Sequence, residues 1–212
     1  MKHYGGMYYP DGEEHMIEWL KKNGAAVNGR VIYQWRKQTA VHAACKQFRT
    51  AVDIGAHVGT WSVNMASRFG RVLAFEPVAA HRECFVLNVT AENVELFPVA
   101  CGAGAKLVSI TRDPHNSGAS HVGGAGDIEM IALDSLGLSD VDLIKMDVEG
   151  YEANVIAGAR ETILRCRPII CAEQKRDFAV KFGLKPTAAT DALRALGMRL
   201  IQEIGGDFIF GW

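Results

Sequence analysis

Two acidic residues and two glycines are spaced so that they could hold a ligand between a strand and a helix. The segment Asp53-Ile54-Gly55-Ala56-His57-Val58-Gly59 lies between an apolar run and a stretch with helical spacing. Glycines here let the chain turn tightly beside a ligand and let the next helix approach the strand. Glu76 ends the next apolar run, where a carboxylate can accept hydrogen bonds from both hydroxyls of a ribose. Acids at two successive strand ends favour nucleotide binding over a glycine turn beside an unrelated surface acid.

The motif D-x-G-x-x-x-G differs from the dinucleotide fingerprint G-x-G-x-x-G, because an acid precedes its first glycine. A carboxylate at that point suits a cationic ligand better than a pyrophosphate. S-adenosylmethionine carries a sulfonium and an ammonium group, so Asp53 would attract it. A helix that starts at Thr60 would add unpaired backbone N–H groups to the same site.

Asp147 and Glu149 follow a later apolar run and are the candidate catalytic residues. Ligands of open α/β sheets bind at the carboxyl ends of the strands. A carboxylate with a raised pKa could take the proton from a hydroxyl acceptor, and the charge of Glu149 would raise the pKa of Asp147 by repulsion. The alternative is that both acids stabilise the start of a helix near Tyr151, an effect of about 0.3–1 kcal/mol each.

The same carboxyl edge of the sheet could instead bind a divalent metal. Asp147, Glu173 and Gln174 end adjacent predicted strands, and Mg²⁺ takes oxygen ligands of this kind. We favour the metal-free alternative, in which Glu173 pairs with a neighbouring cation. The candidate cations are Lys145, Lys175 and Arg176.

Two further groups of residues are weaker candidates. His115 and His121 flank Asn116-Ser117-Gly118-Ala119-Ser120, and either histidine could be a general base, although loop histidines are more often solvated. Tyr33-Gln34-Trp35 precedes the predicted core and could close over an acceptor, although a packed aromatic is the plainer interpretation.

Short apolar runs alternate with helical segments from residue 50 onward, which predicts an α/β fold with a mostly parallel sheet and helices on both faces. The predicted strands are 51–55, 71–76, 94–101, 141–147 and 168–173, and the predicted helices are 61–69, 81–90, 155–166 and 190–196. Two apolar runs, 199–204 and 208–210, flank Gly205-Gly206-Asp207, which predicts a closing antiparallel hairpin.

The chain of 212 residues suits one domain. We expect residues 1–49 to form a helical cover, with helices over 13–22 and 34–48, and residues 50–212 to form the catalytic core. The region 102–133 interrupts the alternation of strands and helices and predicts an inserted hairpin and loop, with a strand over 106–111. Loops this long in compact domains are often functional.

The composition excludes several classes of protein. The formal net charge is −1, so the chain has no overall positive field that would attract nucleic acid or anionic lipid. No apolar run is long enough to predict a membrane span, and no secretory leader is visible. The five cysteines include no C-x-x-C pair, which indicates free thiols in a reducing compartment such as the cytoplasm.

Several motifs together resemble the FkbM-like methyltransferases. The most specific is Ile144-Lys145-Met146-Asp147-Val148-Glu149-Gly150-Tyr151-Glu152. The other matching segments are Asp53 to Gly59, Ala74-Phe75-Glu76-Pro77, Asn116 to Ser120, Leu133-Asp134-Ser135-Leu136, Gly158-Ala159 and Glu173. His57 stands where the family more often has a small polar residue such as Asn. The resemblance covers about residues 51–174.

The resemblance implies a Rossmann-like, class I methyltransferase that uses S-adenosylmethionine, and we expect O-methylation of a sugar or small metabolite. A nucleic-acid methyltransferase and a non-catalytic nucleotide-binding module of the same fold are the alternatives. The residues expected to bind the cofactor are Asp53, Gly55, His57, Gly59, Thr60, Glu76, Pro77, Ala100, Asn116 and Asp147. Asn116 and Ser120 are expected to line the site.

Overall fold

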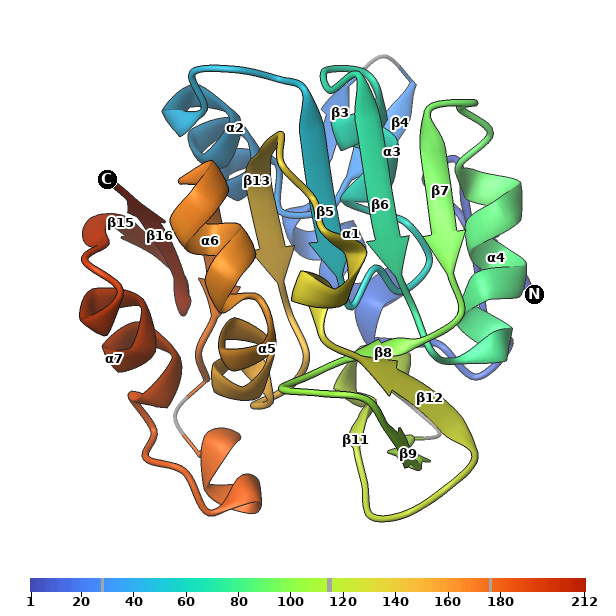
Figure 1. Cartoon of the computed structure of the whole chain (residues 1–212). Coiled ribbons are helices and arrows are strands. Elements are labelled where there is room, and N and C mark those ends of the chain that lie inside the picture. Colours follow the sequence, from blue (N-terminus) through green and yellow to red (C-terminus); the bar gives the residue numbers. More distant parts are fainter. Residues whose placement is uncertain (28, 114–115, 176) are drawn as a thin grey trace.

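The computed structural model describes residues 1–27, 29–113, 116–175 and 177–212, and a seven-stranded sheet runs through its centre (Figure 1). The strand order is β15-β16-β14-β13-β5-β6-β7. All pairs from β14 to β7 are parallel, and β16 is antiparallel to both of its neighbours. The strands are β5 (Thr50–Ile54), β6 (Arg71–Phe75), β7 (Val94–Phe97), β13 (Val141–Met146), β14 (Ile169–Glu173), β15 (Arg199–Ile204) and β16 (Asp207–Gly211). The predicted α/β class with a closing antiparallel hairpin is confirmed.

Helices cover both faces of this sheet because its central strands are buried on both sides. Every residue of β5 is buried, as expected for a parallel strand between two helical layers. The helices are α1 (His15–Asn23), α2 (Trp35–Ala44), α3 (Ser62–Ala66), α4 (Ala79–Asn88), α5 (Glu152–Gly158), α6 (Arg160–Cys166) and α7 (Ala188–Ala195). Side chains of α5, α6 and α7 join one core cluster, and those of α2, α3 and α4 join cores on the opposite face.

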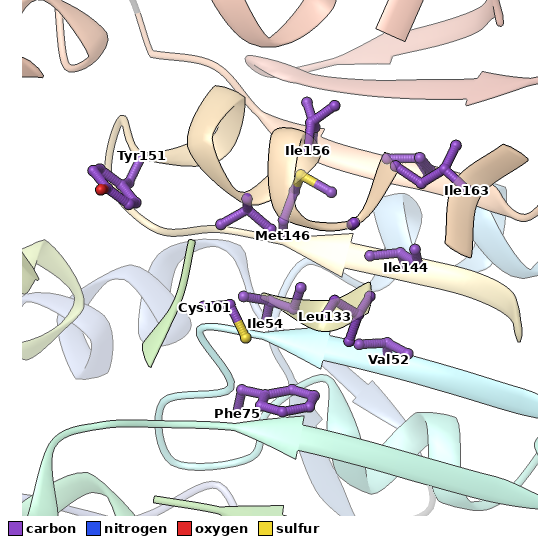
Figure 2. Close-up of a cluster of buried hydrophobic side chains, with 14 of the residues drawn as sticks. Val52, Ile54, Phe75, Cys101, Leu133, Ile144, Met146, Tyr151, Ile156 and Ile163 are labelled. Atoms are coloured by element: carbon purple, nitrogen blue, oxygen red, sulfur yellow. The ribbon is translucent and has the colours of Figure 1, made fainter. Parts of the chain in front are cut away.

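The larger core cluster packs against the strand that leads to the candidate catalytic acids. Figure 2 shows Ile144 and Met146 of β13 beside Ile156 of α5 and Ile163 of α6. Each of the four is at most 3% exposed. Burying a side chain of this size stabilises the fold by about 1.5–3 kcal/mol, so the strand that ends in the candidate catalytic acids is held firmly.

The N-terminal part contains two hairpins besides the two predicted helices. Strands β1 (Lys2–Tyr4) and β2 (Met7–Tyr9) form the first, and β3 (Ala25–Val27) and β4 (Arg30–Ile32) form the second. The sequence prediction of a purely helical cover missed both hairpins, because three-residue strands carry too little alternation to be recognised.

The insertion predicted over 102–133 extends beyond the carboxyl ends of β5 and β6 (Figure 1). A small sheet has the order β8-β12-β9, and β10 pairs with β11. The elements of this region are β8 (Ala100–Cys101), β9 (Lys106–Val108), β10 (Ile110–Thr111), the 3-10 turn η1 (Ser117–Ala119), β11 (His121–Val122) and β12 (Ile128–Ile131). The strand predicted over 94–101 is therefore two strands, β7 and β8, in different sheets. Pro98 separates them and has no N–H to continue a ladder.

Two predicted helices differ from the observed ones in detail. The helix predicted over 155–166 is interrupted at Ala159, where α5 ends and α6 begins. A Cβ atom on Gly158 would clash with the carbonyl oxygen of Gly102 in the insertion, so the close contact between α5 and the insertion needs this glycine. The helix predicted over 61–69 begins at Ser62, two residues after Thr60.

We expect the buried thiols to react slowly in the native state. Cys101 is 3% exposed and Cys171 is 1% exposed, and burial raises the pKa of the Cys171 thiol to about 12. Thiolates are the reactive form, so an electrophilic thiol reagent should label both residues only after unfolding. Rapid labelling of both in the folded protein, followed by mass spectrometry, would contradict their placement on β8 and β14.

None of the helices in the described ranges combines the length and the apolar character that crossing a membrane requires.

Candidate active site

A cavity opens at the carboxyl ends of β5, β6 and β13, where the strand order changes direction. The space between its walls is about 1100 Å³ when the open solvent at its mouth is included. Ligands of open α/β sheets bind at such a switch point, outside the carboxyl ends of the strands. Most of the residues predicted for the site line this cavity: Gly55, His57, Thr60, Glu76, Pro77, Ala100, Asn116, Ser120, His121, Asp147 and Glu149. The structure therefore brings most of the predicted site residues together.

Asp53 and Gly59 are predicted cofactor residues that do not line this cavity. Asp53 is fully buried, with Oδ1 3.1 Å from Nζ of Lys145. Its Oδ2 accepts a hydrogen bond of 2.6 Å from the Ser62 hydroxyl at the start of α3. The negative charge of Asp53 is thus neutralised beneath the loop, and its side chain connects β5, β13 and α3 instead of facing the cavity.

Both motif glycines adopt backbone conformations that other residues disfavour. Gly55 has φ +74° and Gly59 has φ +88°. A Cβ on Gly55 would clash with the carbonyl oxygen of Asp147, and one on Gly59 would clash with Val89, the residue directly after α4. Gly55 therefore lets the loops after β5 and β13 touch, and Gly59 lets the same loop pack on α4.

Glu76 lies at the end of β6 with its carboxylate in the cavity wall and only 4% of its surface exposed. Oε1 accepts from the backbone N–H of Val78 (2.9 Å) and from Nδ1 of His81 (3.0 Å). Oε2 accepts from the backbone N–H of His57 (2.8 Å). These bonds hold the carboxylate at the position that the sequence predicts for ribose binding.

Two acids of the cavity wall, Asp147 and Glu149, meet a third carboxylate, Glu173, at the ends of β13 and β14. Each of Asp147, Glu149 and Glu173 offers an oxygen within 4.8 Å of the others. Lys175 lies between two of them, with Nζ 3.0 Å from Glu173 and 3.3 Å from Glu149. Of the three cations that the sequence offered to Glu173, Lys175 is thus the one beside it, whereas Arg176 is outside the described residues.

Gln174 does not join this cluster, which corrects the predicted metal ligand set. Its Oε1 accepts a hydrogen bond of 3.0 Å from the backbone N–H of Thr190 in α7. Its side chain is thus engaged on the helix side of β14. Glu149 takes the third place in the cluster instead.

The sequence predicts a raised pKa for Asp147, but in the structure the pKa of Asp147 is lowered and that of Glu149 is raised. Burial would raise the pKa of Asp147, but the ammonium of Lys145, a hydrogen bond from Glu173 and the charges of Lys175 and Lys37 lower it. Burial and the negative charge of Asp147 raise the pKa of Glu149 to about 7. Burial, the charge of Asp147 and the hydrogen bond to it raise the pKa of Glu173 to about 9. Asp147 is therefore the ionised member, and Glu173 carries a proton.

The raised pKa of Glu173 makes the stability of the fold depend on pH. The unfolded chain releases this proton near pH 4.5 and the folded chain near pH 9, so stability is lost as pH rises through that window. We expect the free energy of unfolding in denaturant to fall across the window, and Glu173→Gln to flatten the dependence. An equally steep fall in the variant would contradict the assignment of the proton.

Asp147 and Glu149 do not cap the next helix, which was their alternative role. Helix α5 begins at Glu152, whose Oε1 accepts from the backbone N–H groups of Val148 (3.0 Å) and Gly150 (3.2 Å). Glu149 itself has φ +55°, an unfavourable conformation for a residue with a Cβ. Its Oε2 is buried and has no hydrogen-bond partner among the described residues. Strain and an unpaired acceptor at a cavity wall are typical of a functional position.

The N-terminal part contributes a wall that the sequence did not predict. His15, Met16 and Trp19 of α1 line the cavity together with Tyr33. The rings of Trp19 and Tyr33 meet edge to face at 4.7 Å. The structure thus places Tyr33 where the sequence allowed it, over the cavity. Trp61, Lys145 and Lys175 also reach the cavity, and His115 is outside the described residues.

The sheet order and the position of the cavity are those of a Rossmann-like fold. The sequence matches the Methyltransferase FkbM domain over residues 53–200, and the chain belongs to this family, whose cofactor is S-adenosylmethionine. No curated protein matches the sequence.

Solved structures of methyltransferases share the fold. An FkbM methyltransferase from Methylobacillus flagellatus KT has 18% identity and a TM-score of 0.51, covering 78% of this chain and 44% of its own. This chain therefore spans less than half of that protein. Precorrin-6y C5,15-methyltransferase from Geobacter metallireducens GS-15 has 15% identity and a TM-score of 0.52, covering 90% and 94%. A protein from Streptococcus mutans in complex with SAH has 9% identity and a TM-score of 0.50, covering 83% and 94%.

The cavity residues fit S-adenosylmethionine. Glu76 presents a buried carboxylate for hydroxyl groups. Asp147 presents an ionised carboxylate for a sulfonium or an ammonium group. Glu149 Oε2, buried and unpaired, remains free for a second ligand.

Proposed function

We propose that this chain is an S-adenosylmethionine-dependent O-methyltransferase that acts on a hydroxyl of a sugar or small metabolite. One observation carries the proposal: Asp147 and Glu149 open into the same cavity as Glu76. A cofactor held by Glu76 would therefore have two acidic side chains at the other end of its pocket. The bound cofactor supplies an electrophilic methyl group.

Glu149 is the residue best suited to take the proton of the acceptor. Its pKa of about 7 lies near neutral pH, where a general base is most effective. Its Oε1 is engaged by Lys175, and its Oε2 is unpaired. Oε2 of Glu149 would take the hydroxyl proton as the hydroxyl oxygen accepts the methyl group that the bound cofactor would supply, with the neutral thioether as the leaving group. Asp147 remains ionised and orients the hydroxyl.

The cavity walls favour a neutral polyhydroxylated acceptor over a nucleic acid. Aromatic rings of Trp19, Tyr33 and Trp61 line the cavity and suit the apolar face of a sugar ring. The cationic side chains among the described lining residues are Lys145 and Lys175, and both are paired with carboxylates. Phosphate recognition depends on free cations, so a nucleic-acid acceptor has little support.

The proposal is tested by transfer of an isotopically labelled methyl group. The purified chain is incubated with labelled S-adenosylmethionine and a panel of free sugars, glycosides and polyols, with single-stranded RNA and DNA as the rival acceptors. Mass spectrometry locates the label. Label on an oxygen of a sugar or polyol supports the proposal, whereas label on nucleic acid alone would overturn the acceptor class.

We expect activity to survive metal chelation. The ammonium of Lys175 already lies 3.0 Å from Glu173 and 3.3 Å from Glu149, where it balances charge that a divalent ion would otherwise balance. EDTA should therefore leave the rate of methyl transfer unchanged. A saturable Mg²⁺ site in a titration with cofactor present, lost in both Asp147→Ala and Glu173→Ala, would contradict this expectation.

We also propose that the chain works in the cytoplasm. All five cysteines are free thiols, and three of them are buried. Free buried thiols suit a reducing compartment.

A further inference from the structure

The cavity wall beside Glu76 contains a histidine for which the proposed proton transfer has no use. Nε2 of His57 lies 2.6 Å from the hydroxyl oxygen of Ser117. Nδ1 of the same ring is buried and has no hydrogen-bond partner among the described residues. Buried polar atoms are nearly always paired, so this nitrogen indicates a missing ligand.

The hydrogen bonds around Ser117 determine which nitrogen of His57 carries the proton. The Ser117 hydroxyl donates to Oε2 of Glu13, which also accepts the backbone N–H of Ser117 at 2.8 Å. A hydroxyl has one proton, so Ser117 can only accept from His57. Nε2 of His57 is therefore the N–H donor, and Nδ1 has a free lone pair.

His57 stays neutral in this environment. Burial, the neighbouring His81 and the charge of Lys145 lower its pKa well below 6.5. The two imidazole rings lie 4.4 Å apart in an edge-to-face arrangement. Nδ1 is thus a hydrogen-bond acceptor at neutral pH.

Glu76 alone has too few free acceptor positions for a ribose diol. A carboxylate offers about four lone-pair positions. Three are occupied by the N–H groups of His57, Val78 and His81, and the remaining position is on Oε2. A diol brings two O–H donors, so it needs a second acceptor. Oε2 already accepts the backbone N–H of His57, which brings the two residues together.

We propose that Glu76 Oε2 and His57 Nδ1 each accept one of the two ribose hydroxyls, and that Glu13 and Ser117 hold His57 in the tautomer that makes this contact. The inference rests on the proposed function, because it takes the cofactor to be S-adenosylmethionine. The contact also gives a role to two segments outside the central sheet, because Glu13 comes from the N-terminal part and Ser117 from the insertion. Both segments over the cavity thereby contribute to cofactor recognition.

Calorimetric titration with S-adenosylhomocysteine and its 2′-deoxy and 3′-deoxy analogues tests the contact. We expect His57→Phe to weaken binding of the full ligand about tenfold, the effect of one hydrogen bond. The deoxy analogue that lacks the hydroxyl accepted by His57 should bind wild type and His57→Phe equally well. If His57→Phe binds the full ligand like wild type, or if both analogues keep the full tenfold difference, the contact is absent. Failure of wild type to bind S-adenosylhomocysteine would instead refute the proposed function.

The tautomer has its own readout, which does not depend on the ligand. In ¹⁵N NMR of the unliganded protein, His57 should show a protonated, pyrrole-like Nε2 and an unprotonated, pyridine-like Nδ1, with signals assigned by their loss in His57→Phe. Ser117→Ala leaves the ring in place but removes its partner, and should abolish this preference and weaken S-adenosylhomocysteine binding. A protonated Nδ1 in wild type would overturn the proposal even if His57→Phe fails to fold.

Discussion

Replacing Glu149 with glutamine should lower kcat for methyl transfer by about 10²–10⁴-fold, the usual contribution of a general base. Glutamine keeps the size and polarity of the side chain but cannot accept the proton at Oε2. In wild type, kcat should rise with pH through about 7, because the base must lose its own proton before it can act. The pH dependence through this pKa should be absent from the residual activity of the variant.

Two further variants make the result specific to Glu149. Asp147→Asn removes the negative charge that raises the pKa of Glu149, so the midpoint of the pH profile should move to lower pH. Asp142→Asn is the matched control, because Asp142 lies on the same strand but pairs with Arg49, and is not among the residues that line the cavity. An unchanged kcat in Glu149→Gln would assign the proton to another group.

Glu76→Ala should weaken binding of S-adenosylmethionine by about 1–3 kcal/mol, because a buried hydrogen-bonded carboxylate that meets the ribose is lost. Isothermal calorimetry measures the change. Glu76 also accepts N–H groups from His57, Val78 and His81, so the free energy of unfolding must be measured on the same variant.

Two comparisons separate a binding effect from a loss of structure. Glu76→Gln preserves the shape of the side chain and should weaken cofactor binding with a smaller loss of stability. Glu95→Ala removes an acid from the next strand, where it forms an exposed ion pair with Arg71, and should leave cofactor affinity unchanged. Wild-type affinity in both Glu76 variants would refute the ribose assignment.

The sheet and most of the cavity were predictable because their signals are local. Apolar runs that end in an acid, as at Glu76 and Asp147, identify buried parallel strands and their carboxyl edge at once. The topology then brings these ends together, whatever the details of the intervening segments. The family motif around Asp147 fixes the same edge independently.

The remaining features depend on contacts between distant segments. The apolar run of β5 did not reveal that Asp53 contacts Lys145 and Ser62 behind the loop. The lowered pKa of Asp147 depends on Lys145, Lys175 and Lys37, which lie on three different parts of the chain. Trp19 lies in a helix whose apolar side indicated burial but not the cavity that it would line.

A crystal structure with S-adenosylhomocysteine tests the central claim most directly, because that claim places the ribose of the cofactor at Glu76 and its sulfur beside the acids that would bind the acceptor. The account predicts ribose hydroxyls at Glu76 and the sulfur atom turned toward Asp147 and Glu149. A ligand whose ribose lies away from Glu76, or whose sulfur faces away from both carboxylates, would contradict it.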